Sequence, residues 1–160
     1  QIRAGAPLTV TDPNMTRFIM SLEEAVDLVL FAFEEGVSGD ILVQKAPACT
    51  IGVLAEAVRQ LFCPQAEIKV IGIRHGEKMY ETLLTNEECA QAVDLGKFYR
   101  VPCDRRDLNY DKYFIHGDTA RDVLTEFNSG NTTLLDVEAV KAKLLSLSYI
   151  REKLARTGQP

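Results

Sequence analysis

The stretch IKVIGIRHGEKMYETLLTNEE, residues 68–88, gives the strongest indication of how this chain folds and what it holds. Its apolar opening belongs to a strand predicted over residues 67–73, which has the composition of a buried strand. The charged run RHGEK, residues 74–78, follows at once and is centred on Gly76, which lets the backbone turn sharply. Because strand ends in α/β proteins often lead into ligand-binding turns, the stretch predicts a site for an anionic ligand.

Composition limits the class of protein. The chain has 160 residues, 46% hydrophobic and 26% charged, which suits one globular domain or one lobe of a larger protein. The formal net charge of −5 argues against nucleic acid as a partner. The longest apolar run, residues 25–33, is interrupted by Asp27 and is too short to cross a membrane. An anionic ligand must therefore be held by a local group of positive side chains.

The four cysteines, at positions 49, 63, 89 and 103, form no C-x-x-C pair. The two histidines, His75 and His116, do not complete a zinc-binding pattern, so we expect no metal site. Four reduced thiols are typical of a reducing compartment, which predicts a cytoplasmic location.

Helix and strand signals alternate through the first half of the chain. Ser21 begins a capping box that predicts a helix over residues 22–35, and the apolar residues of this helix are so numerous that we expect it to be heavily buried. A second helix is predicted after Thr50. Strands are predicted at residues 7–12, 40–44 and 67–73. This order predicts an α/β fold with a small sheet, flanking helices and some parallel pairing.

The second half has weaker signals. A capping box at Thr85 predicts a short helix ending near Gly96, and a strand is expected to follow it. Residues 102–114 are polar and rich in tyrosine, which favours an extended surface arm. The end of the chain has helical periodicity. We therefore divide the chain into a lobe over residues 1–127, arm included, and a C-terminal helical tail over residues 128–160.

Two motifs for dinucleotide and phosphate binding are absent. The sequence has neither a glycine-rich dinucleotide fingerprint nor a phosphate loop, so we expect this chain alone to bind no nicotinamide cofactor. Tyr149 and Lys153 do form Y-x-x-x-K, the acid–base pair of short-chain dehydrogenases. With no cofactor fold before it in the sequence, we interpret the pair as a coincidental helix face.

Three stretches together resemble a known family. They are PLTVTDPNMTRFIMSLEEAVDLVL (residues 7–30), IGIRHGEKMYETLLTNEE (residues 71–88) and FYRVPCDRRDLNYDKYF (residues 98–114). The chain resembles the C-terminal, substrate-binding part of the extended short-chain dehydrogenase/reductases. It is most similar to the branch of UDP-N-acetylglucosamine 4,6-dehydratases, often also 5-epimerases, of capsule and O-antigen synthesis. Members of this branch are often named UDP-glucose 4-epimerase.

The resemblance implies that this chain is one lobe of an enzyme. In that family a preceding Rossmann domain carries the NADP or NAD cofactor and the catalytic residues, and this domain is absent here. We therefore assign no catalytic residue to the chain and expect it to bind a UDP-sugar without converting it. The arm at residues 102–114 would pack against the missing domain or another subunit, which implies a homo-oligomer.

The resemblance also implies three substrate-binding residues. Arg17 and Arg74 match family arginines that hold the nucleotide-sugar diphosphate, and Glu77 matches the acid that accepts hydrogen bonds from the uridine ribose. The chemistry suits these roles, because a guanidinium pairs two oxygens at once and stays charged. Structural roles are the alternatives: Arg17 could pair with an acidic neighbour, and Arg74 with Glu77. His75 is expected to face solvent or bond to the backbone.

Three functions remain open at this point. The first is a UDP-N-acetylglucosamine 4,6-dehydratase, with or without 5-epimerase activity, to which this chain contributes UDP-sugar binding. The second is a UDP-glucose or UDP-N-acetylglucosamine 4-epimerase, which would bind the same nucleotide in the same way. The third is a non-catalytic module that serves oligomerisation through apolar faces left uncovered.

Overall fold

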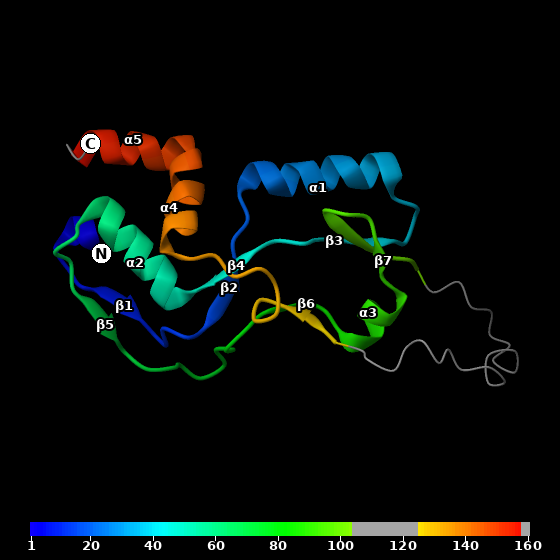
Figure 1. Cartoon of the computed structure of the whole chain (residues 1–160), viewed down its shortest axis with the longest axis horizontal. Coiled ribbons are helices and arrows are strands. Elements are labelled where there is room, and N and C mark those ends of the chain that lie inside the picture. The colour runs from blue at the N-terminus through cyan, green and yellow to red at the C-terminus, as the bar shows by residue number, and fades with distance from the viewer. Residues whose placement is uncertain (104–124, 158–160) are drawn as a thin grey trace, which may run out of the picture. The chain divides into compact units, whose positions relative to one another are not determined.

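The computed structural model describes residues 1–103 and 125–157 (Figure 1). Within these residues the strands form four small sheets with flanking helices, which confirms the predicted α/β class, although a single small sheet was expected. The helices are η1 (Ile2–Ala4), α1 (Leu22–Glu35), α2 (Ile51–Phe62), α3 (Asn86–Gln91), α4 (Val137–Ser146) and α5 (Ser148–Thr157). The strands are β1 (Leu8–Val10), β2 (Thr16–Phe18), β3 (Ile41–Gln44), β4 (Ala48–Thr50), β5 (Ile68–Val70), β6 (Thr82–Leu84), β7 (Val93–Asp94), β8 (Phe98–Val101) and β9 (Phe127–Asn128).

The elements group into two compact units, each assembled from separated stretches of the chain. Unit 1 contains residues 1–21, 46–81 and 129–160, and unit 2 contains residues 22–45 and 82–128. The sequence prediction used continuous segments, 1–127 and 128–160, whereas the contacts place the C-terminal helices in the same unit as the N-terminal strands.

Unit 1 contains the predicted parallel pairing. Strand β1 pairs in parallel with β5, with Val10 opposite Val70, and β2 pairs antiparallel with β4, with Arg17 opposite Cys49. Helix α2 begins where predicted, because the hydroxyl of its N-cap residue Thr50 accepts a hydrogen bond from the Val53 amide at 3.1 Å.

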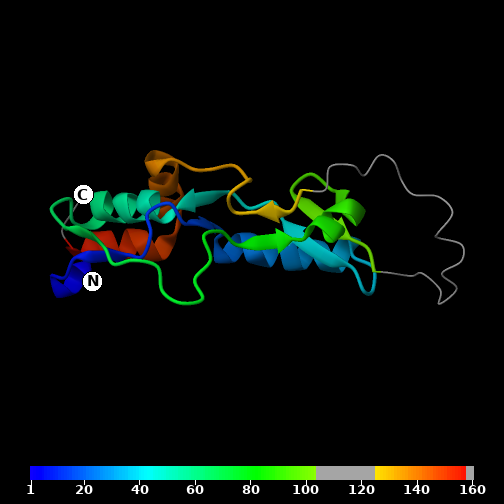
Figure 2. The ribbon, with the colours of Figure 1, turned by 90° about the horizontal axis from the view of Figure 1, so that it is seen from below.

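The core of unit 1 lies between strand β4 and helices α2 and α4. Cys49, Ala57 and Val140 are fully buried together, and α4 and α5 both pack on α2, as Figures 1 and 2 show. Leu144 packs against the same cluster, in agreement with the helical periodicity found at the end of the chain. The helical run is interrupted at Leu147, which separates α4 from α5.

Unit 2 is built on the antiparallel sheet β3-β8-β7, beside the pair β6-β9. Val43, Leu84 and Val101 form its core. The predicted capping box at Thr85 is confirmed, since its hydroxyl accepts from the Glu88 amide and the Glu88 carboxylate accepts from the Thr85 amide. The helix it begins, α3, ends at Gln91 rather than near Gly96, because the chain turns into β7.

Two predictions of burial were wrong. Helix α1 has no buried residue in the described chain, and Leu22 and Phe33 are 78% and 84% exposed. The small sheet of unit 2 covers only one stripe of the helix, where the ring of Phe31 lies 4.5 Å from that of Phe98. The strand predicted at residues 67–73 is likewise shorter and more exposed. Within the described residues it pairs only with β1, and Val70 is 58% exposed.

Two further predictions concern the surface arm and the absence of a membrane-spanning segment. The predicted arm lies outside the described residues from position 104 onward. None of the helices in the described ranges is both long and apolar enough to cross a membrane.

Candidate functional site

The loop that follows β5, residues 71–81, contains the charged run predicted to bind an anion. Gly72 and Gly76 have φ angles of 87° and 86°, a region that side chains other than glycine rarely adopt. Strand β5 therefore ends before Gly72, and the chain turns at Gly76 as the sequence predicts. All of the loop belongs to unit 1.

Arg74 and Glu77 are joined across this turn by main-chain contacts. The Glu77 carboxylate accepts a hydrogen bond from the Arg74 amide at 2.9 Å, and the Glu77 amide donates to the Arg74 carbonyl at 3.2 Å. Among the described residues, the side chains of Arg74 and Glu77 form no ion pair with each other. The guanidinium of Arg74 is exposed and has no ion-pair partner among residues 1–103 and 125–157. His75 is exposed, as predicted.

Arg17 approaches the other end of the same loop from strand β2. Its Nη2 donates to the Lys78 carbonyl at 3.0 Å, and its Nη1 donates to the Thr16 carbonyl at 2.7 Å. Its Nε lies 3.6 Å from Oε1 of Glu81, so the acidic neighbour considered from the sequence is present. Arg17 thus links β2 to residues 78–81, while its side chain remains 28% exposed.

A buried hydroxyl pair anchors the loop to β2. The Ser129 hydroxyl is fully buried, lies 2.8 Å from the Thr16 hydroxyl, donates to the Thr16 carbonyl at 3.0 Å and accepts from the Glu81 amide at 2.9 Å. Two main-chain bonds reinforce it: the Ser129 amide donates to the Glu81 carbonyl, and the Thr16 amide to the Met79 carbonyl, each at 2.9 Å. Sequence reasoning missed Ser129, whose neighbourhood it interpreted only as a boundary.

The structure therefore places the three predicted residues on one framework. The turn brings Arg74 and Glu77 together, and Arg17 binds the carbonyl of Lys78, the next residue along the loop. Guanidinium groups and a carboxylate can bind phosphate oxygens and sugar hydroxyls, respectively. The described residues include no cluster of three side chains able to hold a metal ion.

The shifted pKa values have structural causes away from this loop. Burial raises the pKa of the Cys49 thiol. Hydrogen bonding from Arg59 holds the pKa of the Glu56 carboxyl below its ordinary value. The ammonium of Lys45 does the same for the pKa of Asp94. These contacts brace a helix and a sheet, and they form no proton-transfer pair.

Comparison with known proteins identifies the family. The family described as "Polysaccharide biosynthesis protein" matches residues 1–103, and "Polysaccharide biosynthesis protein C-terminal" matches residues 104–151. The chain belongs to the polysaccharide biosynthesis protein family.

Its relatives include proteins named UDP-glucose 4-epimerase. Those of Rickettsia felis and Rickettsia akari are 54% and 53% identical over 154 residues, which is 96% of this chain and 45% of each relative. The chain thus spans less than half the length of these curated relatives. The X-ray structure of Pen from Bacillus thuringiensis matches 91% of this chain and 42% of its own, with 28% identity and a TM-score of 0.73. The resemblance recognised from the three sequence stretches is confirmed as far as the polysaccharide biosynthesis family.

Proposed function

We propose that this chain is the UDP-sugar-binding part of a nucleotide-sugar-modifying enzyme of polysaccharide biosynthesis. The observation that carries the proposal is the turn at Gly76, which holds the exposed Arg74 beside Glu77. Arg74 and Arg17 would bind the diphosphate, and Glu77 would accept hydrogen bonds from the ribose hydroxyls. The Lys78 carbonyl contact and the Ser129 anchor would fix these groups before the ligand arrives, which lowers the entropic cost of binding.

The reaction of the whole enzyme is a second part of the proposal. We favour a UDP-N-acetylglucosamine 4,6-dehydratase, with or without 5-epimerase activity, for capsule or O-antigen synthesis, because three stretches of the sequence resemble that branch. A UDP-glucose 4-epimerase is the second candidate, and the names of the relatives at 53–54% identity favour it. NADP or NAD would be bound elsewhere in the enzyme, because this sequence has no glycine-rich fingerprint, and we assign no redox step to its residues.

Binding of the nucleotide sugar is tested by calorimetry with UDP-N-acetylglucosamine on the full-length enzyme. Arg74→Ala should weaken binding by about tenfold or more, since a hydrogen bond to a charged group contributes about 1.5–3 kcal/mol. The affinity of Arg74→Lys should lie between that of the original protein and that of Arg74→Ala, because lysine keeps the charge but lacks the planar guanidinium. Lys69→Ala, an exposed cation on β5, is the matched control and should bind normally. Unchanged affinity in Arg74→Ala would contradict the site.

Analysis of the product separates the two reactions. A 4-keto-6-deoxy sugar nucleotide supports the dehydratase, and a hexose inverted at C4 supports the epimerase. The third possibility, a non-catalytic oligomerising module, is favoured by the exposed apolar residues of α1. A full-length protein that binds no UDP-sugar but forms a stable oligomer would support that alternative.

Two further expectations accompany the proposal. We expect a homo-oligomer, because the exposed apolar residues of α1 are typical of a surface that another subunit covers. We also expect a cytoplasmic location, because Cys49, Cys63, Cys89 and Cys103 are all free thiols. Sedimentation of the full-length enzyme and fractionation of the cells that produce it test these expectations separately.

A further inference from the structure

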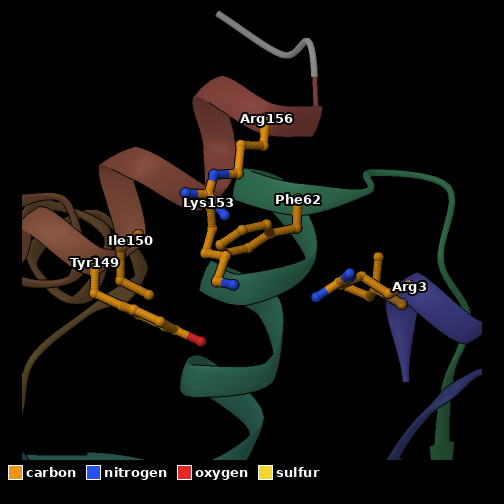
Figure 3. Close-up of a pocket in the computed structure, with 7 residues that line it drawn as sticks. Arg3, Phe62, Tyr149, Ile150, Lys153 and Arg156 are labelled. Atoms are coloured by element: carbon orange, nitrogen blue, oxygen red, sulfur yellow. The ribbon is translucent and has the colours of Figure 1, made fainter.

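A cavity of about 340 Å³ lies within unit 1, apart from the residues of the 71–81 loop (Figure 3). It is lined by Ile2, Arg3, Phe62, Tyr149, Ile150, Lys153 and Arg156. Three elements distant in sequence contribute these residues: η1, the last residue of α2, and α5. The packing of α5 on α2 brings them together.

Helical spacing explains how α5 lines the cavity. Tyr149 and Lys153 are four residues apart and therefore lie on one face of the helix, one turn from each other. The Lys153 ammonium lies 5.1 Å from the centre of the Tyr149 ring, within the range of a cation–π interaction. Figure 3 shows Lys153 and Arg156 reaching from α5 toward the ring of Phe62, with Arg3 approaching from η1. The Y-x-x-x-K pair thus forms part of a cavity wall.

The charge of the cavity is opposite to that of the chain. Among the described residues that line it, Arg3, Lys153 and Arg156 are charged and none carries a carboxylate, whereas the whole chain carries a formal charge of −5. Three cations around a concave surface attract an anion locally, whatever the net charge. The remaining lining is aromatic or aliphatic, which suits an apolar or ring-shaped group.

We propose that this cavity binds a small organic phosphate. The phosphate would be held by Arg3, Lys153 and Arg156, and its ring would contact Phe62 and Tyr149. The volume is near the lower end of the range for ligand pockets, about 300–1,000 Å³, which favours a ligand smaller than a complete nucleotide sugar. The site is separate from Arg74 and Glu77, so the inference goes beyond the proposed function.

The exposure and chemistry of the three cations predict how binding depends on salt and on the phosphate group. Arg3 and Arg156 are exposed, so added salt should screen them and weaken binding. Guanidinium groups can each contact two phosphate oxygens, whereas the lysine contributes a point charge. The phosphate should therefore dominate affinity, and the ring should add a smaller contribution through Tyr149.

Nuclear magnetic resonance of the 15N-labelled 160-residue chain tests the proposal. Titration with pyrophosphate tests binding of an anion alone. Titration with uridine monophosphate tests binding of an anion that carries a ring. Both should shift the amide signals of Phe62 and residues 149–156 in a saturable and salt-dependent way. Signals that move only in residues 74–77, or not at all, would overturn the proposal. The spectrum also reports whether each variant is folded.

Substitutions separate the contributions of the cations and of the aromatic ring to the affinity. Lys153→Met and Arg156→Met should each weaken pyrophosphate binding about tenfold. The matched control Lys69→Met removes one positive charge outside the cavity and should change nothing. Tyr149→Leu should weaken uridine monophosphate more than pyrophosphate. Equal affinity in Lys153→Met, Arg156→Met and the control would overturn the proposal. Arg74→Ala should keep this binding, so failure of one site is distinguishable from failure of the other.

Discussion

The hydroxyl of Ser129 lies 2.8 Å from that of Thr16, although 113 residues separate them in the sequence. Both residues are buried, and the same Ser129 oxygen also accepts from the Glu81 amide at 2.9 Å. One small side chain therefore connects the strand that carries Arg17 with the end of the loop that carries Arg74. The geometry of the candidate site depends on this connection as well as on the charged residues.

Replacing Ser129 with alanine should destabilise the protein measurably. The change removes the hydroxyl from three contacts and leaves the partly buried Glu81 amide without that acceptor, which costs about 1–3 kcal/mol. Urea unfolding followed by circular dichroism measures the loss. Ser146→Ala is the control, because among the described residues its exposed hydroxyl contacts only the Lys143 carbonyl, and its stability should stay within about 0.5 kcal/mol of the original. Equal stabilities for the two variants would contradict the role of Ser129 as an anchor.

Gly76→Ala should weaken both stability and ligand binding. No atom lies within 4 Å of an added Cβ, so the cost arises from the φ of 86°, which is unfavourable for alanine by about 1–2 kcal/mol. Gly96→Ala provides a matched control in unit 2, since its φ is 82° and its added Cβ also meets nothing within 4 Å. Both variants should lose similar stability in urea, but only Gly76→Ala should bind UDP-N-acetylglucosamine less tightly. A normal affinity for Gly76→Ala would show that the turn does not position the ligand-binding groups.

Cys49 should resist alkylation in the folded protein. It is fully buried, and burial raises the pKa of its thiol, so little reactive thiolate forms at pH 8. Iodoacetamide followed by mass spectrometry should modify the partly exposed Cys63 first and Cys49 only after urea is added. Because the folded pKa lies above the unfolded pKa, this thiol favours folding at neutral pH, and that contribution is lost as the pH rises through the raised pKa. Alkylation of Cys49 at the rate of Cys63 in folded protein would contradict its burial.

Local signals were sufficient to predict several elements. Thr50 and Thr85 lie at helix starts because their hydroxyls satisfy amides three residues later, a short-range pattern that the sequence displays directly. The turn at Gly76 was also predictable, because residues other than glycine rarely adopt its φ of 86°. These features depend on neighbours within a few residues.

Features that depend on distant contacts were not predictable. The burial of α1 was overestimated, because its apolar composition does not reveal how much sheet is available to cover it. The apolar residues of β5 predicted a buried strand, yet in the part of the chain that the structure describes it has a single neighbouring strand. Arg17 was assigned a ligand role from family resemblance, but its contact with the Lys78 carbonyl spans 61 residues and became evident only in three dimensions.

The interleaved composition of unit 1 has a consequence for synthesis of the protein. Its first segment, residues 1–21, leaves the ribosome long before residues 129–160, which supply Ser129 and the buried Val140. Unit 1 therefore cannot complete its core until residues 129–160 have been synthesised. Until then its apolar residues remain accessible to chaperones. A nonsense codon after position 128 would leave unit 1 without its third segment, whereas the described residues of unit 2 would all have been made.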